Sequence, residues 1–347
     1  MIAMRDVAHE AGVSVSTVSR ALSGHPHVNE ELRTRIHETA RRLGYRPNDV
    51  ARALRQQRSR TVAIVLPDIL NVTYATVAAV LQRVFQTMGY SVALLMSNND
   101  PTLELDCLEK LRERRVDGVV HVPCTPGGAQ LLTQVGNQIP VVELFRHSRK
   151  RQFDAVLADD DEGAYSIATH LADLGHRRIG IITGSANLST TAHRRDGIMR
   201  ALAARSIDPD ECSILYGDYT RDWGRSAFSE MMRGPEPPTA VFATSTELVL
   251  GALLAAVAQG IRFPEDVSLA GLGNPEWYQV VRTPITTYSL PLEEMATAAA
   301  QLLITRISQA GEVASGPTSF VVSGSLFPRA STTRPHVPPR PWTSSAT

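Results

Sequence analysis

The chain has 347 residues, of which 43% are hydrophobic and 20% charged. This is enough apolar sequence to fill more than one core. The formal net charge is zero, but residues 1–60 hold 11 arginines against 6 acidic residues, so this end is at +5 and the remainder is at −5. We therefore expect a polyanionic partner for the basic end alone, although a basic surface that only faces solvent would give the same count.

Cysteine usage and hydropathy exclude several classes of protein. Cys107, Cys124 and Cys212 show no CxxC spacing and no His/Cys cluster, so we expect no disulfide framework and no metal site, as in a reducing cytosol. The first residues contain no apolar signal segment. The longest apolar run, 248–258, has 11 residues, whereas a membrane span needs roughly 20. The sequence predicts a soluble cytoplasmic protein without a membrane partner.

Two short helical patterns open the chain, in MRDVAHEAGVSVSTVSRALSG, which begins at Met4. Apolar residues recur at helical spacing over 7–11, and Gly12 ends that pattern. Ser14 is placed to cap a second helix, in which Val18 and Leu22 face inward. Two helices joined by a short turn containing glycine form a helix-turn-helix unit, whose second helix enters the major groove of DNA.

A third helix is predicted from Asn29, its N-cap, to Leu43, with Gly44 as its C-terminal cap. Its apolar face consists of Leu32, Ile36, Ala40 and Leu43. The stretch 46–60, RPNDVARALRQQRSR, follows it. A helix here would be too short to be stable alone, because even roughly 12–15 residues are marginal in water.

From Thr61 onward, strands alternate with helices, which is typical of parallel sheets covered on both faces. The first half has expected strands at 61–67, 91–96, 116–122 and 139–144, with helices near 74–88, 102–114 and 127–135. The second half, after Asp160, has helices at 161–174, 190–204, 222–232 and 247–259, with strands at 177–184, 213–216, 240–245 and 267–273. We predict two doubly wound α/β lobes, with a ligand cleft beyond the carboxyl ends of the strands.

Composition and pattern together divide the chain into four parts. Residues 1–46 are the helix-turn-helix head, 47–60 a hinge helix and linker, and 61–327 the two-lobed core. Residues 328–347 are rich in Pro, Ser and Thr and are expected to be a disordered tail.

The motifs DVAHEAGVSVSTVSRALSG and LGYRPNDVARAL, with the collinear pattern over roughly 3–332, resemble the LacI/GalR family of bacterial transcription regulators. The resemblance implies the fold already predicted, with a core like that of periplasmic binding proteins. It also implies a homodimer on a pseudo-palindromic DNA operator, controlled by a small-molecule effector. Faint similarities to the gluconate-repressor branch lie in VVE, GLGNPEW and RAST (329–332).

The resemblance assigns roles in the head by position. Val15, Ser16 and Arg20 match positions that reach base edges, and Arg20 could bind guanine through two hydrogen bonds. Ser14, Thr17, Ser19, Asn29 and Tyr45 match positions that contact phosphates and set register. Ser14 and Asn29 would also be helix caps in any protein, and Tyr45 could belong to the edge of the core.

In this family the stretch after the head is a hinge helix that folds when two copies meet in the minor groove. Asn48 can cap it, Ala51 belongs to its narrow apolar stripe, and Leu54 matches the leucine that kinks the duplex. Arg55 and its neighbouring arginines can neutralise phosphates. The alternative is an exposed linker with Leu54 packed against the core.

The cleft residues also follow from the resemblance. Arg194, three before Gly197, matches the cleft cation, whose expected partner is a carboxylate, phosphate or hydroxyl group. Tyr74 and Tyr219 match lining positions, although each could be an ordinary core residue. Three positions at which sugar-binding members carry acids hold Phe145, Thr246 and Gly273 here. The remaining candidates for effector contact are Glu143, Arg146, Thr246, Asn274 and Trp277.

The loss of these acids with retention of arginines favours an anionic effector, and we expect a sugar acid or a sugar. We predict a homodimeric repressor, without cofactor or metal. An activator of the same architecture is the main alternative, and a solute-binding protein is a weaker one. An enzyme is not expected, because the sequence has no P-loop, strand-associated GxGxxG, HExxH or GxSxG motif.

Overall fold

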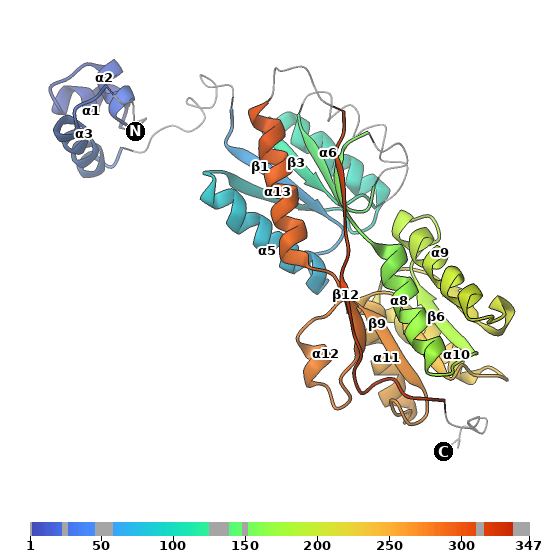
Figure 1. Cartoon of the computed structure of the whole chain (residues 1–347). Coiled ribbons are helices and arrows are strands. Elements are labelled where there is room, and N and C mark those ends of the chain that lie inside the picture. Colours follow the sequence, from blue (N-terminus) through green and yellow to red (C-terminus); the bar gives the residue numbers. More distant parts are fainter. Residues whose placement is uncertain are drawn as a thin grey trace. The chain divides into compact units, whose positions relative to one another are not determined.

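The computed structural model describes residues 2–22, 27–45, 58–124, 139–147, 152–309 and 316–335. They fall into two compact units, Met1–Ser59 and Arg60–Thr347. The predicted helix at 127–135 and the hinge residues Asn48, Ala51, Leu54 and Arg55 lie outside the described residues. Figure 1 shows the elements of both units.

The first unit is a three-helix head consisting of α1 (Met4–Glu10), α2 (Val15–Leu22) and α3 (Glu30–Leu43). Its core is formed by Val7, Ala8, Ala11, Val18, Ala21, Val28, Ile36 and Ala40. Gly12 has φ +63° and Gly44 has φ +69°, so both helix ends use the left-handed conformation that glycine adopts without steric cost. The prediction of a helix-turn-helix unit with a third helix is confirmed.

The second unit contains the N-terminal lobe, whose six-stranded sheet has the order β11-β5-β4-β3-β1-β2. The strands are β1 (Thr61–Leu66), β2 (Ser91–Met96), β3 (Gly118–His121), β4 (Val141–Phe145), β5 (Asp154–Ala158) and β11 (Ser319–Val322). Neighbouring strands are parallel. Helices α5 (Val72–Thr87) and α13 (Leu292–Ser308) pack on one face, and α6 (Pro101–Arg114) packs on the other.

The C-terminal lobe has a second six-stranded sheet, in the order β12-β10-β9-β8-β6-β7. Its strands are β6 (Ile179–Thr183), β7 (Ser213–Tyr216), β8 (Ala240–Ala243), β9 (Ser268–Leu272), β10 (Thr286–Ser289) and β12 (Ser325–Phe327). Helices α8 (Asp160–Asp173) and α9 (Ser189–Ala204) cover one face. Helices α10 (Arg221–Arg233) and α11 (Thr246–Gln259) cover the other, and the short α12 (Trp277–Val280) and 3-10 helix η2 (Pro209–Glu211) complete the lobe.

The chain passes between the lobes three times, after β5, after β10 and after β11. The third passage returns through β12, which pairs antiparallel with β10. Two parallel-sheet lobes are therefore confirmed, but the elements expected from the sequence did not include β5, α12 or the elements from β10 to β12. Helix α13 and strand β11 complete the first lobe although they come from the end of the chain (Figure 1).

The predicted tail begins too early. Ser331 is fully buried, its Oγ accepts from Thr286 N at 2.8 Å, and Leu269 N donates to Ser331 O at 2.8 Å. The backbone oxygen of Thr333 accepts from His176 Nε2 at 2.8 Å. Residues 328–335 thus belong to the C-terminal lobe, because polar Ser and Thr side chains here satisfy backbone groups at the starts of two strands. Residues 336–347 lie outside the described residues.

The state of the cysteines and the character of the helices can be described directly. Cys107, Cys124 and Cys212 are all free thiols, and burial raises the pKa of Cys124 to about 12. None of the helices that the structure describes has the length and apolar character needed to cross a bilayer.

Candidate functional site

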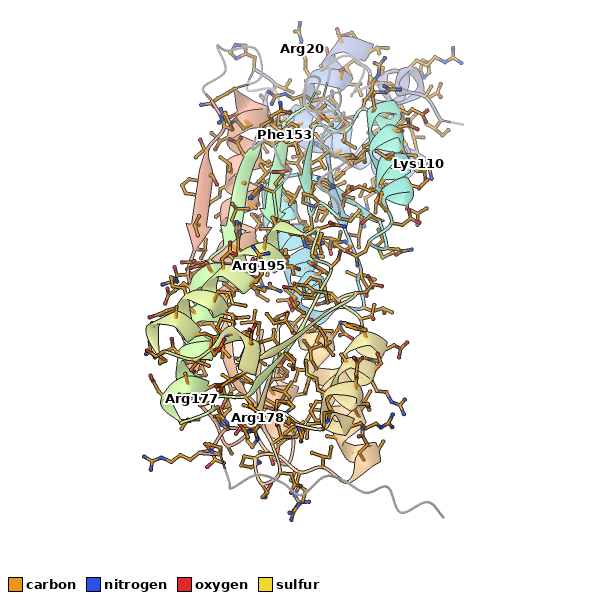
Figure 2. The ribbon with its side chains drawn as sticks, turned by 90° about the vertical axis from the view of Figure 1, so that its right-hand side faces the viewer. Arg20, Lys110, Phe153, Arg177, Arg178 and Arg195 are labelled. Atoms are coloured by element: carbon orange, nitrogen blue, oxygen red, sulfur yellow. The ribbon has the colours of Figure 1, made fainter. Side chains whose placement is uncertain are left out.

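The first candidate surface lies on α2 of the head. Val15 is 47% exposed, and Ser16 and Arg20 are also exposed, whereas Val18 is buried under them. The residues expected to read bases therefore share the outer side of α2 (Figure 2 labels Arg20). The structure places them where a major groove could contact them, which is the geometry of a recognition helix.

Two of the expected phosphate-contacting residues are helix caps as well. Ser14 Oγ accepts from Thr17 N at 3.1 Å, and Asn29 Oδ1 accepts from Glu31 N at 2.9 Å. Tyr45 is half-buried against the core of the head. Capping satisfies helix N–H groups that would otherwise lack partners, so these residues have a structural role whether or not they contact phosphate.

The second candidate site is a pocket of about 900 Å³ that is lined from both lobes. Such a volume is within the range of small-molecule sites. The N-caps of four helices line it: Asn71 of α5, Asp159 of α8, Thr220 of α10 and Ser245 of α11. They meet here because helices begin where parallel strands end, and their dipoles favour negative charge on a ligand.

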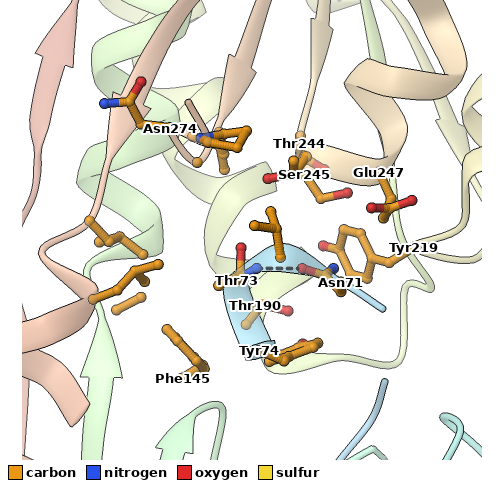
Figure 3. Close-up of a pocket in the computed structure, with 18 of the residues that line it drawn as sticks. Asn71, Thr73, Tyr74, Phe145, Thr190, Tyr219, Thr244, Ser245, Glu247 and Asn274 are labelled. Carbon is orange, nitrogen blue, oxygen red and sulfur yellow. Dashed lines mark hydrogen bonds between the residues drawn. The ribbon is translucent and has the colours of Figure 1, made fainter. Parts of the chain in front are cut away.

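Aromatic side chains contribute much of the pocket wall. The rings of Tyr74 and Phe145 lie edge to face, with centroids 5.9 Å apart. Tyr219 comes from the other lobe and lies across the pocket from Phe145 (Figure 3). Tyr74 and Tyr219 therefore line the pocket, as the resemblance implied.

Arg194 is ion-paired and hydrogen-bonded within the protein, so its guanidinium is not free to bind a ligand in the way that the resemblance implied. Its Nη2 lies 2.6 Å from Asp160 Oδ1, and its Nε lies 2.7 Å from the same oxygen. Its Nη1 donates to Thr244 O at 2.7 Å and to the Tyr219 hydroxyl at 3.0 Å. Burial alone would lower the pKa of Arg194, but the charge of Asp160 raises it above the usual value. Arg194 thus stays protonated, and its charge is already neutralised.

Arg146 is the second cation of the pocket, and it is 5% exposed. Its Nη1 donates to Pro123 O at 3.2 Å and its Nη2 to the Tyr74 hydroxyl at 2.9 Å. Its guanidinium lies 5.9 Å from the centre of the Tyr219 ring, which belongs to the other lobe. Within the described part of the chain, no carboxylate lies within ion-pair distance of Arg146. Arg146 is therefore a buried cation that has no direct ion-pair partner among the described residues.

The pocket is not depleted of carboxylates, contrary to the sequence argument. Its lining includes six acids: Asp68, Asp159, Asp160, Asp222, Glu247 and Glu276. Asp222 and Glu276 are exposed, and Glu247 pairs with Arg221 at 3.3 Å. The pocket thus has carboxylates at positions other than the three considered in the sequence. Asp222 and Glu276 carry exposed negative charge, whereas Arg146 is buried.

Two of the expected effector contacts, Glu143 and Trp277, do not line the pocket. Glu143 is fully buried in β4, in register with His121 of β3, and does not line the pocket. Its place in the strand turns it toward the inside of the lobe because side chains alternate along a strand. Trp277 packs edge to face on Tyr278, with ring centroids 4.5 Å apart, and also lies outside the lining.

Thr246 and Asn274 do line the pocket. Thr246 begins α11 and is 3% exposed. The side chain of Asn274 is engaged by the C-terminal segment, since Arg329 Nη2 donates to Asn274 Oδ1 at 2.7 Å. In Figure 3, Asn274 lies on the side of the pocket away from Tyr74 and Tyr219.

Sequence reasoning missed several lining residues, above all Asp160. It stands in a run of four acids, 159–162, that only suggested the acidic start of a helix. Other lining residues that it missed include Asn71, Thr190, Thr244, Ser245 and Tyr288. Strand ends followed by small polar residues would have been a usable signal, because ligands bind at that edge of a parallel sheet.

Comparison with known proteins gives a consistent result. Residues 3–48 match the lacI family of bacterial regulatory proteins, and residues 168–332 match the periplasmic binding protein-like domain. Catabolite control protein A of Priestia megaterium is 31% identical over 303 residues, 87% of this chain and 91% of that protein. The repressor CytR of Escherichia coli K12 is 30% identical over 329 residues, 95% of this chain and 96% of that protein.

Solved structures agree in fold. The lac repressor dimer bound to operator and anti-inducer has a TM-score of 0.84 at 23% identity, with 96% of this chain and 99% of that chain covered. The complex of the transcriptional regulator CelR with cellobiose has a TM-score of 0.69 at 28% identity, with 96% and 100% covered. The chain has a helix-turn-helix head and a two-lobed core, and it matches these relatives over nearly its whole length. It therefore belongs to the lacI family of bacterial regulatory proteins, which bind DNA and are not enzymes.

Proposed function

We propose that this chain is a homodimeric, cytoplasmic transcriptional repressor whose operator binding is controlled by a small molecule in the interlobe pocket. The observation that carries the proposal is the pairing of an exposed α2 surface (Val15, Ser16 and Arg20) with a core that contains a large two-lobed pocket. DNA reading and ligand binding are then separate tasks of one chain, and they are coupled through the residues between the two units.

Base reading is assigned to three side chains of α2. Arg20 can donate two hydrogen bonds to the major-groove edge of guanine, and Val15 can contact a thymine methyl group. Ser14, Thr17, Ser19, Asn29 and Tyr45 are proposed to contact phosphates. The hinge residues Asn48, Ala51, Leu54 and Arg55 are proposed to enter the minor groove, with Leu54 as the apolar wedge.

Exposed apolar residues support pairing of two chains. In the N-terminal lobe, Leu94 and Met96 of the edge strand β2 are 43% and 42% exposed. In the C-terminal lobe, Leu254 and Val257 on one side of α11 are 43% and 80% exposed. Apolar surface of this kind is costly in water and is typical of protein contacts. A second copy of the chain is the proposed occupant, since a two-fold dimer presents two heads to a symmetric operator.

The effector is proposed to be a sugar acid or a sugar. A solved relative binds cellobiose and another, from Enterococcus faecium, contains ribose. The aromatic walls of this pocket suit the apolar faces of sugar rings, and the polar helix starts suit hydroxyl groups. The buried positive charge at Arg146 favours an acid over a neutral sugar.

Effector control is proposed to be allosteric. A ligand that binds one arrangement of the lobes more tightly shifts the population toward it, and operator and effector must then change each other's affinity by the same factor. Activation in place of repression would use the same architecture. The position of the operator relative to the promoter distinguishes the two.

The experiment that tests DNA reading is enrichment of random duplexes by the full chain, followed by affinity measurements on the recovered sequences. Arg20→Ala should lose discrimination at one base pair of each half-site, by about 1–3 kcal/mol. Arg112→Ala, which removes an exposed arginine of α6 in the core, is the charge-matched control and should change nothing. An equal loss of affinity for all sequences would instead make Arg20 a phosphate contact.

A further inference from the structure

We propose that Arg146 is the residue that selects an anionic effector, and that buried Glu104 positions it through the peptide group between Pro123 and Cys124. Arg146 would bind a carboxylate or another oxyanion of the ligand. This inference rests on the proposed effector-binding function of the pocket. Glu104 does not line the pocket, so its role is one of positioning and not of contact.

Glu104 is an unusual residue for its place in the fold. It lies in the first turn of α6 and is fully buried. Its Oε1 accepts from the backbone N of Cys124 at 2.7 Å and lies 2.9 Å from Nε2 of His121, which is also buried. A buried carboxylate is costly unless it is paired and hydrogen-bonded. Burial would raise the pKa of Glu104, but these hydrogen bonds and the charge of His121 hold it below the usual value.

The link to the pocket is a single peptide group. The carbonyl of Pro123 and the N–H of Cys124 belong to the same planar unit. Glu104 accepts from its N–H end at 2.7 Å, and Arg146 donates to its C=O end at 3.2 Å. A negative charge at the N–H end polarises the peptide and strengthens its carbonyl as an acceptor. Glu104 thus fixes and electrostatically supports Arg146 from one peptide group away.

This arrangement leaves the guanidinium available to a ligand. A guanidinium has five N–H donors, and the described contacts of Arg146 use Nη1 for Pro123 O and Nη2 for the Tyr74 hydroxyl. Arg194 differs, because Asp160 pairs with it directly. The indirect support of Arg146 explains why this buried cation can remain without a carboxylate at contact distance. A ligand oxyanion would supply that missing partner.

The test is isothermal titration of the full-length chain at constant ionic strength with D-glucuronate, D-gluconate and inorganic sulfate. D-Glucose and D-sorbitol serve as the uncharged counterparts of the two sugar acids, and chloride serves as the counterpart of sulfate. The variants are Arg146→Gln, Glu104→Gln and their combination. Glu109→Gln, on the exposed side of the same helix, is the matched control.

We expect the wild-type chain to prefer at least one of the three anions over its counterpart by about tenfold or more, as for a charge-assisted hydrogen bond. Glu104→Gln and Arg146→Gln should each remove most of this preference, and the double variant should lose no more than Arg146→Gln alone. Glu109→Gln should behave as wild type. A merely structural Glu104 would instead add its own loss in the Arg146→Gln background.

Three results would overturn the inference: no anion preference in wild type, a preference retained in Arg146→Gln, or a preference unchanged in Glu104→Gln. If Glu104→Gln does not fold, Glu104→Asp keeps the charge but withdraws it from Cys124 N, and it should lower the preference where Glu109→Asp does not. DNA affinity is measured on the same samples. Loss of anion preference in a chain that still binds its recovered duplex separates failure of this inference from failure of the proposed function.

Discussion

At the scale of single residues, the pocket depends on which charges are neutralised inside the protein. The resemblance pointed to Arg194 as the cleft cation that binds the effector, but its N–H groups already donate to Asp160 and Thr244. Arg146, which was also a candidate for effector contact, has no carboxylate at ion-pair distance among the described residues and donates instead to Pro123 O and the Tyr74 hydroxyl. Sequence could not decide between them, because Asp160 is 34 residues from Arg194 and has acidic neighbours on both sides.

The buried ion pair between Arg194 and Asp160 should contribute to the stability of the fold. Arg194→Ala leaves Asp160, which is 3% exposed, as an uncompensated buried charge. We expect a loss of about 3–5 kcal/mol in the free energy of unfolding, measured by urea denaturation. Arg195→Ala is the control, because Arg195 is 51% exposed and pairs with its exposed neighbour Asp196. Its effect should be below about 0.5 kcal/mol. Equal small effects of both variants would contradict the interpretation of Arg194 as a structural ion-paired residue.

At the scale of helices and strands, most elements could be predicted because their local signals agree with their packing. Asn29 caps α3 and Gly44 ends it, as the sequence indicated. Strands β1 to β4 were predicted from their apolar, partly β-branched sequences, whereas β5 was not predicted. The lobe to which α13 and β11 belong could not be predicted, since an apolar helix after β10 packs equally well on either sheet. The assignment of these elements to the N-terminal lobe depends on where the chain crosses between the two lobes.

The C-terminal segment 328–335 shows where composition misleads. Its Ser and Thr residues, typical of a tail, instead bind the starts of β9 and β10 through Ser331 and Thr333. His176 Nε2 donates to Thr333 O at 2.8 Å and its Nδ1 lies 2.8 Å from Thr239 Oγ1, while His170 Nε2 lies 2.9 Å from Thr332 Oγ1. Short polar side chains in this segment replace the missing backbone partners of the sheet, a role that composition alone cannot show.

This segment makes the stability of the chain depend on pH. Burial lowers the pKa of both His170 and His176. The folded chain therefore binds protons at these residues more weakly than the unfolded chain, so the free energy of unfolding falls as pH drops below about 6.5.

A chain that ends at Phe327 should be less stable at pH 7.5 and should lose less stability on acidification, because its histidines are more exposed. A chain that ends at Pro335 should match the full-length chain in thermal denaturation. Identical pH curves for all three would contradict this role of the segment.

At the scale of the whole molecule, the chain combines two units that differ in structure. The head presents α2, and the core holds the pocket and the exposed apolar faces. Figure 2 shows Lys110 and Phe153 in the N-terminal lobe and Arg177 and Arg178 in the C-terminal lobe. The assembly of two chains is what would turn one helix-turn-helix unit into a reader of a long, symmetric site.

Charge on the proposed dimer face should separate the chains. Val257→Asp places a carboxylate at a residue of α11 that is 80% exposed, so a monomeric fold tolerates it and a buried interface does not. We expect analytical ultracentrifugation to show monomers where the wild type is a dimer. Val321→Asp, at a residue of β11 that is 62% exposed, is the matched control and should remain a dimer. Dimerisation that survives Val257→Asp would move the interface away from this face of α11.

The most direct test of the central claim is native mass spectrometry of the full chain on the duplex that it enriches from a random pool. We expect an inverted repeat in the recovered sequences and two chains on each duplex. Recovery of no preferred sequence, or a single chain on a site without symmetry, would contradict it.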